Sequence, residues 1–245
     1  MSSQTKKGRA VVIVTLLLAI AALTSIPIAF REDFRRYWSV WQLTSEDSGT
    51  RRAAAEFLHE IGALSSIPRI VRAECHFRDL LDFVVGFAAN DREAVVRGLG
   101  AVLHSATEET EVRCYAAQLL AVIGVGSDRT TQHLSQAENS AAPAVKNCAR
   151  EAQKKLQDSR QPSTLGLVIA DRGGHLAIQD LLSGGMAQRL RFRRGDVLRE
   201  FTGQEVTSLA ALAGIVRDAQ PGDIFDVVIE RDGERLEKKL LVGRR

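Results

Sequence analysis

The sequence lacks the motifs on which several enzyme families depend. It contains no Gly-rich phosphate loop ending in Gly-Lys-Ser or Gly-Lys-Thr, which P-loop ATPases need to hold nucleotide phosphates. It has no Gly-x-Ser-Gly-Gly segment around a nucleophilic serine. His59-Glu60 begins like the zinc-protease pattern His-Glu-x-x-His, but Ala63 stands where the second histidine is needed. We therefore expect no catalytic residue, no metal ligand and no cofactor.

One segment imitates an ATPase motif. LSGGMAQRL, from Leu182 to Leu190, looks like the signature loop of ATP-binding-cassette ATPases. Such a loop works only together with a phosphate loop and opens a long helix, whereas Gly195-Asp196 predicts a turn after about two helical turns. The similarity is accidental, and the chain is expected not to be an enzyme.

Net charge is low and cysteine is scarce. A formal charge of +3 with interspersed signs is too small to predict nucleic-acid binding. Three cysteines, Cys75, Cys114 and Cys148, show no C-x-x-C spacing, which excludes a typical zinc site. We expect all three to be small buried residues packed as apolar side chains. The alternative, in an exported chain, is one disulfide and one free thiol.

A long uncharged segment lies near the N-terminus. Residues 11–30 carry no charged side chain, and about 20 apolar residues suffice for a helix to cross ~30 Å of hydrocarbon. We expect a transmembrane helix here, preceded by a short tail, residues 1–10, with Lys6, Lys7 and Arg9. A cleaved signal peptide and a secreted protein are the alternative, because a basic tail also precedes signal peptides.

Side chains typical of a membrane interface follow this segment. They are Arg31, Arg35, Arg36, Tyr37, Trp38 and Trp41. Basic residues flank the segment equally on both sides, so charge alone does not fix the orientation. The short tail favours a cytoplasmic N-terminus, with the following domains outside the cytoplasm, in the periplasm of a bacterial envelope.

Residues 31–157 show helical periodicity. In residues 50–62 the apolar side chains recur at three- and four-residue intervals and end at Gly62. Residues 111–124 and 144–156 align with each other, with a Val-Arg or Val-Lys pair near the start and small residues on one face. This pattern resembles HEAT-type repeats, in which helix pairs stack into a solenoid. We expect an all-α, HEAT-like segment; a plain helical bundle is the alternative.

The spacing of apolar residues changes after residues 158–164, which form a polar linker. From Leu165 onward, short alternating strands are separated by turn residues, and Asp232-Gly233 predicts a tight hairpin. A single clear helix is expected after Thr207 or Ser208, either of which is a good N-cap.

Several of these segments occur together, in order, in one family. They are Ser183 to Ala187, Leu190 to Leu198, Phe201 to Val206, Pro221 to Asp223 and Val228 to Gly233. Together they resemble the bacterial PDZ domains found in trypsin-like heat-shock proteases. Gly185 stands where that family usually has proline, and Leu190 where it has an Ala-Gly junction. The resemblance covers residues 165–243 and implies an α+β domain, a small partly open β-barrel with two helices.

The resemblance implies peptide binding by addition of a strand to the sheet. Gly166, between Leu165 and Leu167, matches the loop whose N–H groups receive a C-terminal carboxylate. The predicted peptide-binding residues are Leu165, Gly166, Leu167, Val168, Ile169, Leu209, Ala213 and Val216. The last three lie on one face of the expected helix, with Leu212 and Ile215 toward the core.

The sequence thus predicts a multi-domain membrane protein that acts as an adaptor or scaffold for protein or peptide ligands. Two alternatives remain open. One is a regulatory subunit that presents substrates to an envelope protease. The other is an inner-membrane connector similar to the bitopic PDZ component of type II secretion.

Overall fold

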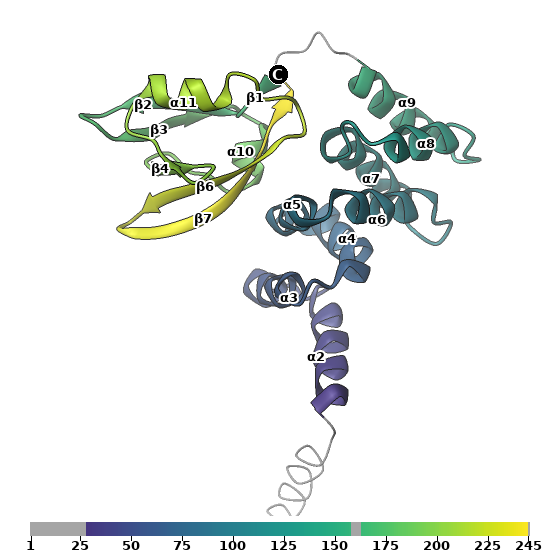
Figure 1. The fold of residues 1–245 in the computed structure, drawn as a ribbon. Coiled ribbons are helices and arrows are strands. Elements are labelled where there is room, and N and C mark those ends of the chain that lie inside the picture. Colours follow the sequence, from purple (N-terminus) through teal and green to yellow (C-terminus); the bar gives the residue numbers. More distant parts are fainter. Residues whose placement is uncertain (1–27, 158–162, 245) are drawn as a thin grey trace, which may run out of the picture.

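The computed structural model describes residues 28–157 and 163–244. We call these ranges the helical half and the sheet half (Figure 1). The expected tail and most of the expected transmembrane segment lie outside the described residues, as does most of the expected linker. Within the described part of the chain, no helix is both long and apolar enough to span a membrane.

Every regular element of the helical half is a helix, as the periodicity predicts. The helices are α2 (Ile28–Gln42), α3 (Ser48–Glu60), the 3₁₀ helix η1 (Leu64–Ser66), α4 (Ile67–Phe77), α5 (Leu81–Asn90), α6 (Arg92–His104), α7 (Thr110–Ile123), α8 (Asp128–Ala137) and α9 (Pro143–Gln157). Local signals set several of the ends. The carboxylates of Asp47 and Asp91 cap α3 and α6 by accepting from the N–H groups of Thr50 and Ala94.

The helices of this half form two layers. Helix α6 packs between α4 and α8, while α7 packs beside α9 and α3 beside α5. Consecutive helices connect the layers, and Figure 1 shows the stack descending from α9 to α2. Buried aliphatic and alanine side chains fill the space between the layers. The expectation of an all-α segment is confirmed; its closer likeness to HEAT repeats stays a prediction.

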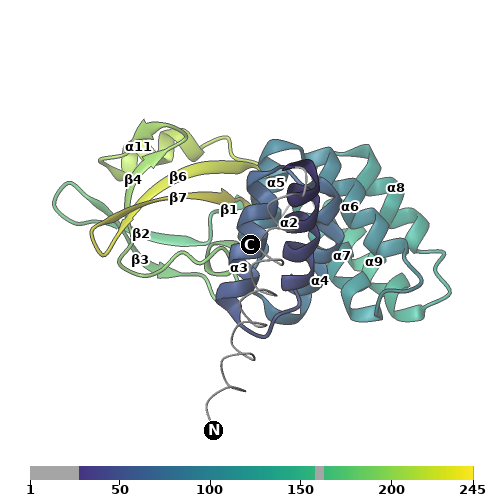
Figure 2. The ribbon, with the colours of Figure 1, turned by 90° about the horizontal axis from the view of Figure 1, so that it is seen from below.

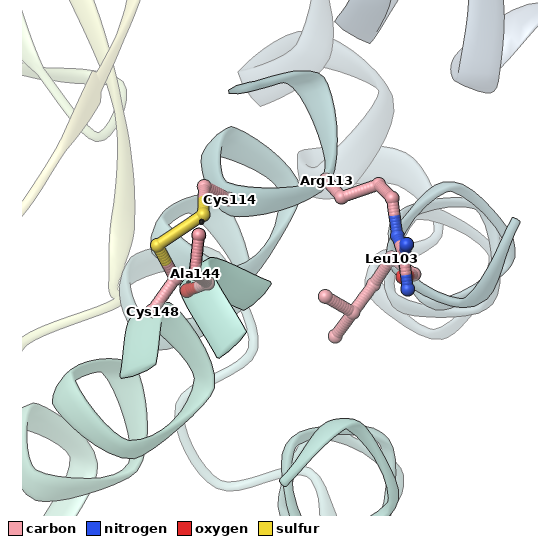
Figure 3. Close-up of a disulfide and its surroundings, with 5 residues drawn as sticks. All are labelled: Leu103, Arg113, Cys114, Ala144 and Cys148. Carbon is pink, nitrogen blue, oxygen red and sulfur yellow. Dashed lines mark hydrogen bonds between the residues drawn. A yellow bond between two sulfur atoms is a disulfide. The ribbon is translucent and has the colours of Figure 1, made fainter. Parts of the chain in front are cut away.

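The cysteines differ from expectation. Cys114 of α7 and Cys148 of α9 form a disulfide, with their Cα atoms 5.4 Å apart (Figure 3). The expectation of three buried thiols is therefore wrong for this pair, because the two helices pack side by side and bring the half-buried sulfur atoms together. It is confirmed for Cys75, which is free and 3% exposed.

The sheet half is an antiparallel sheet with two helices. Its elements are β1 (Ser163–Thr164), β2 (Leu167–Asp171), β3 (Leu176–Leu181), α10 (Met186–Arg189), β4 (Val197–Phe201), β5 (Gln204–Glu205), α11 (Leu209–Val216), β6 (Ile224–Arg231), β7 (Glu234–Leu241) and β8 (Gly243–Arg244). The main sheet has the order β2-β3-β4-β6-β7, with β5 paired to β4, and β1 pairs separately with β8. Ser163 and Thr164, expected in the linker, are thus part of this half.

Two local predictions in this half are confirmed and one is wrong. Arg231 pairs with Glu234 across a two-residue turn in which Asp232 and Gly233 both have positive φ, as a tight hairpin requires. Ser208 caps α11 by accepting from the N–H of Ala211 at 3.2 Å. The helix α10 is shorter than the two turns expected, because its chain already turns at Leu190.

A buried ion pair holds the Gly-Asp turn. Asp196 is 1% exposed, and both its carboxylate oxygens accept from the guanidinium of Arg231, at 2.7 and 2.8 Å. One oxygen also accepts from the backbone N–H of Arg193 at 2.8 Å. The turn that separates α10 from β4 is therefore fixed to strand β6, across the sheet.

The two halves pack against each other (Figure 2). Buried residues from both belong to one continuous apolar cluster, and α5 lies against β7. Arg92 at the start of α6 donates to the carbonyl of Gly222 at 2.7 Å. A Cβ atom at Gly222 would come within 2.8 Å of the Val125 Cβ, so the glycine permits this close approach. The sheet half is consequently held in a defined position on the helical half.

Candidate functional site

Strand β2 is an edge of the main sheet. It pairs with β3 on one side, and no other described strand pairs with it. A bulge between Val168 and Ile169 interrupts the β2–β3 register. An edge strand leaves one row of backbone N–H and C=O groups free to pair with an added chain. The outer edge of β2 is therefore the part of the predicted site whose backbone groups are free to pair with an added strand.

The loop before β2 has the conformation that a glycine provides. Gly166 has a φ of +72°, in the region that other residues rarely adopt. Its carbonyl accepts from the N–H of Leu182 at 3.0 Å, which fastens the loop to the segment after β3. Its own N–H donates to the Thr164 hydroxyl at 3.1 Å. A ligand carboxylate would therefore share or replace that hydrogen bond.

Helix α11 packs beside β2 and has two faces. Leu212 is 4% exposed and belongs to the core, while Leu209 in the first turn is 45% exposed. Ala213 is also exposed, whereas Val216 is partly buried and packs against the core cluster. The end of α11 that carries Leu209 therefore presents an apolar side chain to solvent near the sheet edge.

The structure brings the predicted residues into one region. Leu165, Leu167 and Ile169 are partly buried and contact the core cluster, while Val168 is 41% exposed. The residues of the loop and β2 form one side, and those of α11 form the other. Whether a peptide binds between them stays a prediction.

Sequence reasoning places Thr164 in the expected loop but assigns its side chain no role. Its hydroxyl oxygen accepts from Gly166, which leaves the hydroxyl hydrogen available to donate to an anion. Thr164 also lines a cavity of about 350 Å³ between the halves, together with Gly185 of the sheet half and Val122 and Lys155 of the helical half. Among the described residues that line this cavity, Lys155 is the charged one. No sequence signal links residue 155 to this loop, because the contact depends on how the halves pack.

The short helix α10 connects this loop to the helical half. At its start, a Cβ atom on Gly166 would lie 3.5 Å from the Ala187 Cβ. At its end, the guanidinium of Arg189 donates to the Tyr115 hydroxyl and lies 3.7 Å from the Glu74 carboxylate. The two ends of this short helix thus lie beside the candidate loop and at the interface between the halves.

Glu74 of α4 lies at that interface. It is 1% exposed, and it accepts from the Tyr115 hydroxyl at 3.0 Å and from the backbone N–H of Leu80 at 2.6 Å. Burial raises the pKa of the Glu74 carboxyl, and burial likewise raises the pKa of the Tyr115 hydroxyl. Tyr115 therefore keeps its proton and donates it in this hydrogen bond.

His59, which begins the sequence that resembles a zinc-protease motif, packs against side chains of the helical half. The His59 ring packs edge-on against Phe87, with centroids 4.9 Å apart, and close to Gly86. In the part of the chain that the structure describes, no three His, Cys, Asp or Glu side chains gather in a way that could hold a metal ion. His59 therefore belongs to the packing between α3 and α5.

Part of the chain is similar to several solved structures. No protein-family model matches the sequence, and no curated protein matches it. Among solved structures, the HtrA-type protease AlgW with a decapeptide matches at 18% identity, over 41% of this chain and 35% of that chain, with a TM-score of 0.33. AlgW with a tripeptide matches at 20% identity over 40% and 38%, with a TM-score of 0.32.

A serine endoprotease from Yersinia pestis also matches, at 16% identity over 41% of this chain and 36% of that chain, with a TM-score of 0.31. The chain thus spans little more than a third of the length of these proteases. At these TM-scores the similarity assigns neither an activity nor a ligand to this chain.

Proposed function

We propose that this protein is a membrane-anchored, non-catalytic adaptor whose sheet half is a PDZ domain that binds C-terminal peptides of partner proteins. The observation that carries the proposal is the edge strand β2, entered through Gly166 at positive φ and flanked by the exposed Leu209 of α11. A peptide added to this edge gains main-chain hydrogen bonds from β2, and its side chains meet the apolar surface of α11.

The C-terminal carboxylate of the ligand is received at the loop of Thr164 to Leu167. A desolvated carboxylate needs several hydrogen-bond donors. The loop offers the backbone N–H of Gly166 and the hydroxyl of Thr164, which is already hydrogen-bonded to that N–H. The neighbouring apolar side chains Leu165 and Leu167 favour an apolar last residue in the ligand.

The location proposed for both halves is outside the cytoplasm, held by the apolar residues 11–30. The disulfide between Cys114 and Cys148 supports this location, because disulfides persist in oxidising compartments and are rare in the cytosol. A reporter enzyme fused after Arg245 and active only outside the cytoplasm is expected to be active; activity of a cytoplasm-only reporter contradicts the proposal.

The test of ligand binding uses the full chain and a library of peptides with free C-termini. We expect selective binding, and we expect amidation of the selected peptide to weaken it by about tenfold or more, since a hydrogen bond to a charged group contributes roughly 1.5–3 kcal/mol. Equal binding of the acid and the amide, or no selectivity, contradicts the proposal.

A matched pair of glycine variants distinguishes an effect on the carboxylate loop from a general effect of backbone strain. Gly166→Ala is expected to lower the affinity, because a side chain at φ +72° displaces the loop. Gly173→Ala introduces similar strain at φ +68° in the β2–β3 turn, with nothing within 4 Å of the added atom. It should leave the affinity unchanged, and equal losses in both variants would reject the carboxylate loop.

A further inference from the structure

Helix α2 carries a row of exposed aromatic side chains. Phe34 is 57% exposed, Tyr37 72%, Trp38 47% and Trp41 61%. Trp38 stacks against Phe34, with centroids 6.4 Å apart, and contacts Trp41, with centroids 5.0 Å apart. We call these four residues the aromatic face. It contains both tryptophans of the chain.

The opposite side of α2 packs against the rest of the helical half. Ser39 and Leu43 are buried against the helical half, and α2 packs against α3. The helix is therefore fixed on one side and uncovered on the other. Contiguous apolar surface that stays exposed on a protein is typical of an interaction site.

The spacing of the aromatic face is that of a helix–helix seam. Phe34, Tyr37 and Trp41 are separated by three and then four residues, as at the a and d positions of a coiled coil. Trp38 flanks this seam. Beside it, Tyr37 and Trp41 line a hollow of about 420 Å³ whose far wall includes Phe77 of α4. A facing helix could place an aromatic side chain in this hollow.

Two of the charges near the face are held within the chain itself. The guanidinium of Arg35 lies 4.2 Å from the centre of the Phe57 ring. Arg36 donates to the Ser65 hydroxyl at 2.6 Å. These two residues are the charged ones between Phe34 and Trp41. Both contact side chains of the helical half. Arg69 and Arg72 also line the hollow, and Arg72 donates to the Glu108 carboxylate.

The position of α2 argues against lipid as the cover for the whole face. Helix α2 begins at Ile28, within the apolar residues 11–30. Trp41 is eleven residues beyond Phe30, which is about 16 Å along a helix. The headgroup layer on one side of a bilayer is roughly 5–8 Å thick. If α2 leaves the membrane upright, lipid headgroups reach Phe34 but not Trp41, whereas a second helix covers both.

We propose that the aromatic face packs, in parallel, against the aromatic face of a second copy of this chain. The parallel arrangement rests on the proposed membrane anchor, because two chains held at the same end by one membrane present α2 at the same height and in the same direction. A two-fold axis between them then brings Phe34, Tyr37 and Trp41 next to their counterparts, as in a self-complementary interface.

The first test is crosslinking of the full chain in lipid vesicles. Phe34→Cys and Trp41→Cys are made separately, with Glu56→Cys on the exposed surface of α3 as the control. Under mild oxidation we expect covalent dimers at positions 34 and 41 and none at 56. Crosslinks between 34 and 41, in a mixture of the two variants, without crosslinks at either position alone would indicate antiparallel helices and overturn the parallel arrangement.

The second test uses tryptophan fluorescence, which reports on this face alone because Trp38 and Trp41 are the only tryptophans. We expect a shift of emission to shorter wavelength, and protection from aqueous acrylamide, as the protein-to-lipid ratio rises. Tyr37→Arg, at a position 72% exposed, should weaken the self-association by about tenfold without changing the circular dichroism spectrum. Quenching by brominated lipid at every protein-to-lipid ratio would assign the face to the membrane and overturn the proposal.

Flotation of the vesicles tests the proposed membrane anchor separately from the proposed self-association through the aromatic face. A chain that does not float with the vesicles, yet still crosslinks at positions 34 and 41, contradicts the anchor and supports the seam. A chain that floats and stays monomeric at every ratio contradicts the seam.

Discussion

The guanidinium of Arg189, on α10 of the sheet half, donates a hydrogen bond to the hydroxyl of Tyr115, on α7 of the helical half. That hydroxyl donates in turn to the buried carboxylate of Glu74. The ring of Tyr115 also receives the guanidinium of Arg78, 4.4 Å from its centroid. One tyrosine thus connects the sheet half, through a short helix that touches the candidate loop at Gly166, with two helices of the helical half.

Tyr115→Phe should loosen this junction. The change removes the hydroxyl and leaves a buried Glu74 oxygen without its donor, which costs roughly 1–3 kcal/mol. We expect a corresponding decrease in the free energy of unfolding, measured by denaturant titration, and faster amide hydrogen exchange in α10. Tyr37→Phe changes the other tyrosine, which is 72% exposed, and should leave both unchanged. Equal effects of the two variants would contradict the role of Tyr115.

Glu74 should make stability depend on pH in a defined direction. Burial raises its pKa above the ordinary value of 4.5, so the folded state holds this proton more tightly than the unfolded state. The resulting stabilisation is complete below about 4.5 and is lost as pH rises through the raised pKa. Unfolding free energies of the native chain and of Glu74→Gln, measured from pH 4 upward, should therefore diverge. Parallel curves would mean that Glu74 titrates normally.

Reduction of the disulfide should destabilise the helical half. Cys114 and Cys148 are 34 residues apart, and a crosslink of this kind typically contributes about 2–4 kcal/mol. We expect the thermal midpoint of the native chain to fall in the presence of dithiothreitol. A double Cys114→Ser, Cys148→Ser variant provides the control, because dithiothreitol should not affect it. Mass spectrometry after alkylation should find one free thiol, Cys75, in the unfolded native chain.

Two ion pairs of the sheet half should differ sharply in their contributions. Asp196 is buried and bound by Arg231, so Asp196→Ala leaves an uncompensated, partly buried cation and should cost about 3–5 kcal/mol. Asp180 is exposed and binds Arg194 at 2.9 Å. Its replacement by alanine should not measurably change the unfolding midpoint, because solvent screens exposed pairs. Similar midpoints for the two variants would reject this assignment.

The hydroxyl of Thr164 should contribute to ligand affinity. Thr164→Val keeps the shape of the side chain and removes both the acceptor for the Gly166 N–H and the donor for a carboxylate. We expect weaker binding of free-acid peptides by calorimetry, whereas Thr164→Ser should retain most of the affinity. Weakening that is equal for free-acid and amidated peptides would show that the hydroxyl does not meet the carboxylate.

Elements governed by neighbouring residues could be predicted from the sequence. The hairpin at Asp232-Gly233 and the Ser208 cap depend on residues within a few positions, and both are found as expected. The sequence does not delimit helix α8 on its own, because Leu134 is the one large apolar side chain among its buried residues Thr130, Leu134 and Ala137, and its remaining side chains are mostly polar. Those three residues recur at four- and three-residue intervals, as one face of a helix requires, so α8 follows the helical pattern of its half without a strong apolar signal of its own.

Contacts between distant parts of the chain could not be predicted. The pairing of Cys114 with Cys148 depends on the packing of α7 against α9, and the position of Lys155 near Thr164 depends on how the two halves dock. For the candidate site, the sequence predicts the loop at Gly166 and the helix face with Leu209. It does not predict that the Thr164 hydroxyl already occupies the Gly166 N–H, since that needs the actual backbone.

The measurement that tests the central claim most directly is amide hydrogen exchange of the full chain with and without a peptide selected from the C-terminal library. Addition of a strand at β2 predicts slower exchange within residues 166–171 and no change in β7, which packs against α5 at the other edge of the sheet. Protection at a different surface, or none in β2 at saturating peptide, would contradict peptide binding by this edge.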